Sequence, residues 1–270
     1  MQIKVAAIQM VSAPEVATNL ATAERLIIQA AEEGAEVALL PEYFCLMGRR
    51  DTDKVDSKEA PGGPIQTYLA ECARRHRITI IGGTVPLISP KAGRVLNTCT
   101  VFGPDGAPIA RYDKIHLFSF RRGEEKFDEA ATILPGRTPV VCDLPTAAGT
   151  LLRTGLSICY DLRFPELYRQ MSPLDLIVVP SAFTYTTGQA HWELLLRARA
   201  VENQCFVLAA AQGGTHATGR RTWGHSMLVD PWGEIKAVLP EGEGVVCGVV
   251  DTARTDEVRS NLPALSHRAL

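Results

Sequence analysis

Short apolar runs recur along the chain, separated by proline, glycine and charged residues. Many of them have the length and composition of β-strands. The runs cover residues 3–10, 37–40, 78–87, 97–102, 139–144, 151–159, 176–183, 205–212, 226–230 and 245–250. Some, such as 176–179, are continuously apolar, which is typical of strands covered on both faces. The pattern therefore predicts a sheet protein whose central strands are buried between other layers.

Between several of these runs, apolar residues recur at helical spacing. The predicted helices cover residues 19–33, where Gly34 ends the helix, 65–76, 165–171 and 191–204. Residues 97–102 alternate instead, and the Gly-Pro-Asp-Gly turn at 103–106 after them is typical of a hairpin. Strand-helix-strand units combined with hairpins favour a layered α/β protein with a mixed sheet or two packed sheets.

Two of the apolar runs end in a similar way. Residues 37–44 and 176–183 share an apolar stretch, a proline, a polar residue and an aromatic residue, which suggests that two halves of the chain are built alike. Ligands of open α/β sheets bind beyond the carboxyl ends of strands. We therefore expect the chemistry at the polar residues that follow strands, namely Glu42, Ser181 and residues 159–161.

Composition and charge narrow the classes of function. The 270 residues are 46% hydrophobic and 21% charged, with no low-complexity segment, as in one compact domain spanning residues 1–270. A formal net charge of −2 provides no field that would attract nucleic acid or an anionic membrane surface. No apolar run approaches the ~20 residues of a membrane span. The expected partner is a small molecule, with no nucleic acid and no membrane.

The chain contains seven scattered cysteines and no Cys-x-x-Cys pair. This spacing argues against a disulfide framework or a zinc ribbon, and with no export signal it predicts a cytoplasmic protein. Most of the cysteines lie in apolar runs and are expected to be small buried side chains. Cys159 differs because a polar turn follows it and leads into a helix, where backbone N–H groups favour a thiolate. Cys45, close to Glu42, is the rival candidate.

A nucleophilic thiol needs a base and a group that stabilises the oxyanion. Histidine is the usual base, so His116 and His225 stay open as partners. A serine nucleophile fits less well, because residues 155–159 have Cys159 where the Gly-x-Ser-x-Gly elbow has its second glycine. No phosphate-binding or dinucleotide fingerprint and no His-Glu-x-x-His metal motif occurs. We therefore expect cysteine chemistry without a metal or an organic cofactor.

Three ordered blocks resemble the catalytic blocks of the nitrilase superfamily of carbon-nitrogen hydrolases. They are residues 39–42 (Leu-Leu-Pro-Glu), 111–118 and 155–166. Residues 180–184, 191–205 and 224–233 look most like the Nit branch, which includes deaminated glutathione amidases and the Nit half of NitFhit proteins. The resemblance implies a four-layer α-β-β-α sandwich with two packed mixed sheets. It also implies a homodimer or a higher homo-oligomer, with helices 165–171 and 191–204 near the interface.

The same resemblance implies a catalytic triad. Glu42 corresponds to the general base, Lys114 to the electrostatic stabiliser and Cys159 to the nucleophile. Such a set suits amide hydrolysis, because the carboxylate takes the thiol proton while the ammonium and the backbone N–H of Tyr160 stabilise the tetrahedral oxyanion.

The family also has a second glutamate in the site. Aligning the Pro-Gly step at 135–136 assigns it to Glu129 rather than to Glu124 or Glu125. We expect Glu129 to position Lys114, with Tyr160 in a supporting role.

Arg163, Ser181 and Thr184 are the candidate substrate-binding residues, and Arg163 could hold a carboxylate or form a structural ion pair. Arginine pairs at 121–122 and 220–221 would also suit a carboxylated substrate. The predicted function is an amidase that releases ammonia from an ω-amide, deaminated glutathione being the family-level expectation. A nitrilase or an N-carbamoyl amino-acid amidohydrolase with the same triad, and a catalytically silent binding or scaffold protein, are the alternatives.

Overall fold

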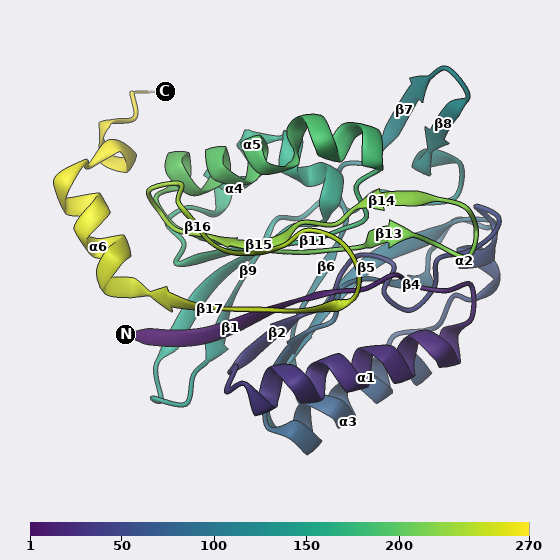
Figure 1. Ribbon diagram of the computed structural model, residues 1–270, viewed down its shortest axis with the longest axis horizontal. Coiled ribbons are helices and arrows are strands. Elements are labelled where there is room, and N and C mark those ends of the chain that lie inside the picture. Colours follow the sequence, from purple (N-terminus) through teal and green to yellow (C-terminus); the bar gives the residue numbers. More distant parts are fainter. Residues whose placement is uncertain (270) are drawn as a thin grey trace.

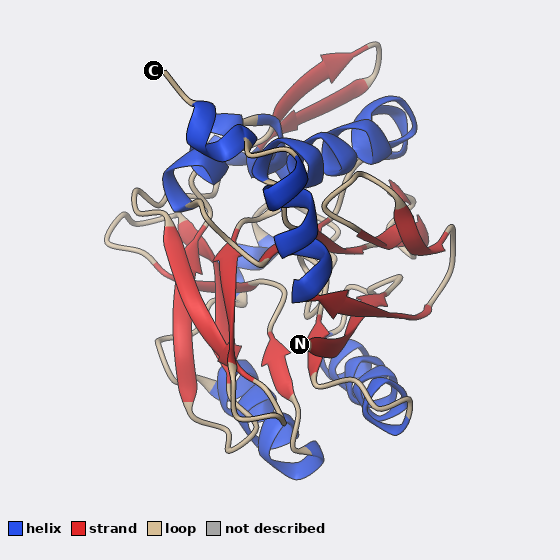
Figure 2. Ribbon diagram, turned by 90° about the vertical axis from the view of Figure 1, so that its left-hand side faces the viewer, coloured by secondary structure: helices blue, strands red, loops and turns tan. Residues whose placement is uncertain are grey.

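The computed structural model describes residues 1–269, which form four layers in the order helix, sheet, sheet, helix (Figure 1). Helices α1 (Val16–Glu32) and α3 (Pro64–His76) make one outer layer. Helices α4 (Pro165–Met171) and α5 (Tyr185–Asn203) make the other. Figure 2, a view from the side on which the N-terminus lies, shows the strands enclosed between these two helical layers. The expected four-layer α-β-β-α sandwich with two packed mixed sheets is confirmed.

Each of the two central sheets mixes parallel and antiparallel strands. The first has the order β17 (Gly244–Asp251), β1 (Gln2–Gln9), β2 (Val37–Leu39), β3 (Thr79–Ile81), β5 (Val95–Phe102) and β4 (Val85–Ile88), with β6 (Pro108–Asp113) also paired to β5. The second has the order β16 (Ile235–Leu239), β15 (Ser226–Val229), β12 (Phe206–Ala211), β11 (Leu176–Ser181), β10 (Leu151–Leu156) and β9 (Val140–Pro145).

The two sheets repeat one pairing pattern. From β17 to β4 the successive pairs are antiparallel, parallel, parallel, antiparallel and antiparallel. From β9 to β16 the same order of pairs recurs. Strands β2 and β11 therefore occupy equivalent third positions. These are the strands whose ends share a sequence pattern, in agreement with the prediction that two halves of the chain are built alike.

Strand β1 explains why the central runs are apolar throughout. Val5 and Ala7 point into the core between the two sheets. Ala6 and Ile8 point the other way and pack beneath α1 and α3. Successive side chains of a strand alternate between faces, so a strand buried on both faces must be apolar at every position.

Several short elements surround one end of the sandwich. The hairpin of β7 (Ser119–Arg122) and β8 (Glu125–Asp128) projects from it (Figure 1), beside the hairpin of β13 (Gly213–Thr215) and β14 (Arg221–Trp223) and the helix α2 (Asp53–Asp56). Helix α6 (Thr252–Asn261) follows β17. Short 3₁₀ helices cover Glu129–Ala131, Cys159–Arg163 and Ala264–His267.

The sequence prediction was wrong at several boundaries. Residues 78–87 form two strands rather than one, because Gly83 adopts a φ of +52° against the backbone of Pro41. The strand expected at 151–159 ends at Leu156. The helix expected to begin at residue 191 begins at Tyr185, where the Thr184 side chain accepts a hydrogen bond from the Thr187 N–H and caps it.

Other elements were not predicted at all. They are β7, β8, β13, β14, β16, α2 and α6, whereas β6 is the partner strand of the hairpin predicted at 97–106. The β7–β8 hairpin lies within a charged segment and is largely exposed on both faces, so it lacks a continuous apolar face. Helix α6 likewise buries few side chains, so its sequence carries little helical periodicity.

Candidate active site

The candidate triad meets between the two sheets, beyond the carboxyl ends of their central strands. Glu42 follows β2, and Cys159 follows β10. Lys114 directly follows β6. All three side chains are buried. Residues far apart in the chain therefore converge where open α/β sheets usually bind ligands.

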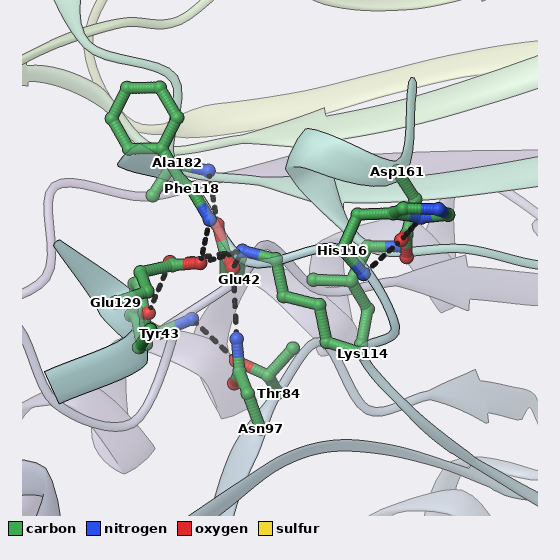
Figure 3. A network of polar contacts seen from close by, with 12 residues as sticks. Glu42, Tyr43, Thr84, Asn97, Lys114, His116, Phe118, Glu129, Asp161 and Ala182 are labelled. Carbon is green, nitrogen blue, oxygen red and sulfur yellow. Dashed lines mark hydrogen bonds and ion pairs between the residues drawn. The ribbon is translucent and has the colours of Figure 1, made fainter. Parts of the chain in front are cut away.

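The carboxylate of Glu42 is held by three donors (Figure 3). Its Oε1 accepts hydrogen bonds from Lys114 Nζ at 2.8 Å and from Asn97 Nδ2 at 2.9 Å. Its Oε2 accepts one from the backbone N–H of Ala182 at 3.0 Å. Ala182 directly follows β11, so the ends of the two equivalent strands β2 and β11 are joined through this carboxylate. The three donors hold the carboxylate in one orientation.

The ammonium group of Lys114 lies between two carboxylates. Its Nζ is 2.8 Å from Glu42 Oε1, and 3.0 and 2.8 Å from the two oxygens of Glu129. Burial opposes its charge, but Glu129 and Glu42 outweigh this, and the pKa of Lys114 is raised above its ordinary value. Lys114 therefore stays cationic and acts as an electrostatic group rather than as a base.

Glu129 is in turn fixed by neighbouring donors. The backbone N–H of Phe118 donates to Oε2 at 2.7 Å, and the Tyr43 hydroxyl donates to Oε1 at 2.9 Å (Figure 3). Burial raises the pKa of Glu129, but the adjacent Lys114 and these donors lower it below its ordinary value overall. The expected contact between Glu129 and Lys114 is thus present. Sequence reasoning missed Tyr43, although it directly follows Glu42.

Cys159 begins the 3₁₀ turn after β10 with a φ of 50°. A non-glycine residue in this region holds a strained backbone, which is a recurrent feature of nucleophiles on sharp turns. Burial and the negative charge of Glu42 raise the pKa of Cys159 well above its ordinary value, although Lys114 opposes the shift. The resting side chain is therefore a thiol whose proton must be removed during the reaction.

Asp161 ties the turn of the nucleophile to the surrounding elements. Its buried Oδ2 accepts hydrogen bonds from the Tyr112 hydroxyl at 2.7 Å and the Ile158 N–H at 2.9 Å. Its Oδ1 accepts from the His116 N–H at 3.0 Å and lies 2.7 Å from His116 Nδ1. Sequence reasoning listed Asp161 among the polar residues after the strand but assigned it no task.

The two histidines considered as bases are engaged elsewhere. His116 contacts Asp161 and stacks on Phe164 with ring centroids 3.7 Å apart. His225 stacks on Trp223 with its Nδ1 3.0 Å from the Trp223 carbonyl oxygen. The carboxylate of Glu42 is therefore the better placed base.

The rival cysteine lies apart from this arrangement. The thiol of Cys45 is 3.5 Å from the carbonyl oxygen of Thr84. Burial, aided by the charge of Glu59, raises the pKa of Cys45 to about 12. This environment is typical of a structural cysteine.

Two adjoining pockets open the site to ligands. A narrow one, next to Cys159, is lined by Phe118, Tyr160, Ala182, Phe183, Thr184 and Thr187. A wider one shares Phe118 with it and includes Tyr43, Lys54, Glu129 and Arg220. Of the residues expected to support catalysis or bind substrate, Tyr160 and Thr184 line the narrow pocket.

Arg163 and Ser181 lie behind this lining. The guanidinium of Arg163 lies over the rings of Tyr160 and Phe183, 5.7 and 5.5 Å from their centroids, and is 3.3 Å from His191. The buried hydroxyl of Ser181 donates to the carbonyl oxygen of Val179 at 3.4 Å. Within residues 1–269, no three His, Cys, Asp or Glu side chains are arranged to hold a metal ion.

Comparison with known proteins assigns the family. The carbon-nitrogen hydrolase family model matches residues 4–260. The chain belongs to the carbon-nitrogen hydrolase family. This carbon-nitrogen hydrolase is 41% identical to the deaminated glutathione amidase of Synechocystis over 97% of both chains. It is 39% identical to human omega-amidase NIT2, covering 93% of this chain and 89% of that protein.

A solved structure agrees with this assignment. The hydrolase superposes on the crystal structure of the Caenorhabditis elegans NitFhit protein with a TM-score of 0.88 and 37% sequence identity. The match covers 99% of this chain and 65% of the NitFhit chain, so the hydrolase spans about two thirds of that protein. The resemblance to the Nit branch of the nitrilase superfamily is confirmed.

Proposed function

We propose that this hydrolase is an amidase that releases ammonia from the ω-amide of a small carboxylated molecule, through a thioester on Cys159. One observation carries the proposal. A buried ammonium, that of Lys114, lies between the carboxylates of Glu42 and Glu129, and the charges of these three groups act on the buried thiol of Cys159. The names of the relatives, a deaminated glutathione amidase and an omega-amidase, support the same substrate class.

Acylation begins when Glu42 takes the proton from the thiol of Cys159. The sulfur attacks the amide carbonyl carbon, and the carbonyl oxygen becomes an oxyanion stabilised by the Lys114 ammonium and the Tyr160 N–H. When the oxyanion collapses, the C–N bond breaks and Glu42 returns the proton to the leaving nitrogen, which departs as ammonia. A thioester on Cys159 remains.

Deacylation uses the same groups in the reverse order. Glu42 takes a proton from a water molecule, whose oxygen attacks the thioester carbonyl. The second oxyanion collapses with cleavage of the C–S bond, and the thiolate recovers the proton from Glu42. The products are a carboxylic acid and the regenerated thiol. No metal or organic cofactor takes part in this proposed sequence.

The remaining sequence assignments enter the proposal as supporting roles. Glu129 positions Lys114, and Thr184, which lines the narrow pocket, contacts the bound chain. Arg163 and Ser181 stay predicted substrate-binding residues, although their side chains lie behind the lining of that pocket.

A substrate panel tests the proposal. We expect ammonia release from ω-amides such as succinamate to exceed release from nitriles and from N-carbamoyl amino acids. Intact-mass spectrometry during turnover should detect an acyl group on Cys159. Faster turnover of nitriles or of N-carbamoyl amino acids than of ω-amides would contradict the amidase assignment and support the corresponding alternative. Absence of turnover and of acylation on every compound would favour a silent binding protein.

We further propose that the hydrolase acts in the cytoplasm, as one domain over residues 1–270, and as a homodimer or a higher homo-oligomer. Within the described residues, no helix is long and apolar enough to cross a membrane. Self-association is supported by exposed apolar side chains on and beside α5. Leu194 and Val201 are two turns apart on this helix, and the turn of Trp232 packs on it. Exposed apolar patches are typical of interaction sites.

A further inference from the structure

Arg220 differs from the ion-paired arginines of this protein. Its Nη2 donates to the carbonyl oxygen of Ala182 at 3.3 Å, and its guanidinium lies 5.4 Å from the centroid of the Phe127 ring. Its Nη1 faces the sulfur of Met47 at 3.7 Å. Within residues 1–269 no carboxylate lies at ion-pair distance from Arg220, and its buried Nε has no hydrogen-bond partner. A half-buried guanidinium thus keeps donors unused beside the wider pocket.

A second cation lines the same pocket. Lys54 is 16% exposed, its Nζ donates to the Thr132 hydroxyl at 3.2 Å, and it lies 3.8 Å from Asp51, which is itself exposed. Burial lowers the pKa of Lys54 and the charge of Arg220 lowers it further, whereas Asp51 and Glu129 oppose the shift. The two cations therefore face the same pocket, and an anion bound there would stabilise the charged form of both side chains.

The other charged groups of the pocket already have partners. Glu129 is bound by Lys114, and Asp128 accepts the Ala130 N–H at 3.1 Å. Arg50 is paired with Asp53 at 2.9 Å. Among the cations that line this pocket within residues 1–269, Arg220 is therefore the one with no carboxylate at ion-pair distance.

Arg220 is also linked to the catalytic base through one residue, Ala182. Ala182 accepts from Arg220 through its carbonyl oxygen and donates to Glu42 through its N–H. The pocket of Arg220 and the pocket of Cys159 share Phe118 as a wall. A short molecule could therefore reach Cys159 with one end and Arg220 with the other.

We propose that Arg220, assisted by Lys54, binds the free carboxylate of the substrate and thereby selects ω-amides of dicarboxylic acids over neutral amides. This inference rests on the proposed amidase function and assigns its specificity to one side chain. A guanidinium suits the task because its planar fork binds both oxygens of a carboxylate. In the absence of a carboxylate, the buried Nε remains without a partner, which penalises neutral substrates.

The test compares ammonia release from succinamate and from its methyl ester, which has the same length without the charge. Arg220→Gln should lower kcat/KM for the acid by roughly 10- to 100-fold and leave the ester nearly unchanged. For the acid, kcat/KM of Arg220→Lys should lie between the values of the wild type and of Arg220→Gln. Lys54→Met should cause a smaller loss of kcat/KM, again for the acid and not for the ester. Arg221→Gln is the matched control, because Arg221 pairs with Glu241 and lies over the Tyr185 ring.

The acid-to-ester ratio decides the inference. An unchanged ratio in Arg220→Gln, or loss of the acid preference in Arg163→Gln instead, would overturn it. If the wild-type protein hydrolyses neither compound, the amidase proposal fails, and the inference is then tested by binding alone. Succinate should raise the thermal unfolding temperature of the wild type and of Arg221→Gln but not of Arg220→Gln. Equal stabilisation of all three would refute the carboxylate site.

Discussion

Asp161 accepts a hydrogen bond from the backbone N–H of Ile158 at 2.9 Å, across the turn that carries Cys159 between them. Because Cys159 adopts a φ of 50°, an outside constraint must hold the turn in this strained region. Asp161 is fully buried and connects the turn to Tyr112 on β6 and to His116. We infer that this carboxylate positions the nucleophile without touching the substrate.

Replacing Asp161 with Asn should therefore misplace the nucleophile. The amide nitrogen of Asn cannot accept, so at least one buried donor loses its partner, at a cost of about 1–3 kcal/mol in the free energy of unfolding. We expect kcat to fall at least about tenfold. Tyr112→Phe removes a single donor and is the matched control, expected to retain most activity. Full activity of Asp161→Asn in steady-state ammonia release would contradict the positioning role.

Cys159 should be the essential cysteine. Cys159→Ala should abolish turnover, because no sulfur remains to form the thioester. Cys45→Ala should remain active, since the Cys45 thiol contacts Thr84 and lies in a buried structural environment. Ammonia release by both variants, with circular dichroism as the check on folding, tests this assignment. Normal turnover of Cys159→Ala together with an inactive Cys45→Ala would reverse it.

Glu42→Gln should slow both acylation and deacylation. A neutral amide cannot accept the thiol proton, and the raised pKa of Cys159 leaves little thiolate at neutral pH without a base. The expected loss in kcat is about 10²- to 10⁴-fold. Single-turnover measurement of acyl-enzyme formation by mass spectrometry separates the two steps. A loss below tenfold in a folded variant would exclude Glu42 as the general base.

The predicted and observed architectures agree where the signal is strong apolar patterning. The buried strands β1, β2 and β11 are continuously apolar, and their sequences predicted both the layers and the equivalence of β2 with β11. The exposed hairpin β7–β8 and helix α6 carry no such pattern, because contacts with distant parts of the chain hold them. Thr186 on α5, for example, donates to Glu125 on β8.

The sequence allowed the residues of the candidate site to be identified from ordered blocks, but it did not predict the contacts between their side chains. The blocks indicated Glu42 and Lys114, the Pro-Gly step at 135–136 indicated Glu129, and the structure brings these side chains together. Arg220 was one of several arginines expected to suit a carboxylate, but it could not be singled out, because the sequence shows neither which arginines find a carboxylate nor which face a pocket. Arg220 and its neighbour Arg221 look alike as a pair, yet Arg221 pairs with Glu241.

The exposed side chains of α5 predict an oligomer that a single charge can disrupt. Leu194, at 68% exposure, lies two turns before Val201 on one face of the helix. Leu194→Asp should raise the dissociation constant of the homo-oligomer at least about 100-fold, because a charge would be buried at the interface. Ile88→Asp, at another exposed apolar residue on β4, is the control. Identical sedimentation of wild type and Leu194→Asp would exclude an interface through this face.

Glu129→Gln should change the acid stability of the protein in a defined direction. Because the folded-state pKa of Glu129 lies below its ordinary 4.5, the carboxylate contributes stability above that pH and loses it as the pH falls further. The variant lacks this contribution at every pH and leaves Lys114 with one carboxylate fewer, at a cost of about 3 kcal/mol near neutrality.

The difference in unfolding free energy between wild type and Glu129→Gln should thus be constant above about pH 5.5 and shrink below pH 4.5. Denaturant titrations over this range measure it. Glu124→Gln, in the exposed turn of the β7–β8 hairpin that precedes Glu129, should match the wild type throughout. A difference that stays constant down to pH 3 would mean that the pKa of Glu129 is the same in the folded and in the unfolded chain. The contact with Lys114 would then contribute no stability, and Glu129 would serve only to orient the ammonium toward the oxyanion.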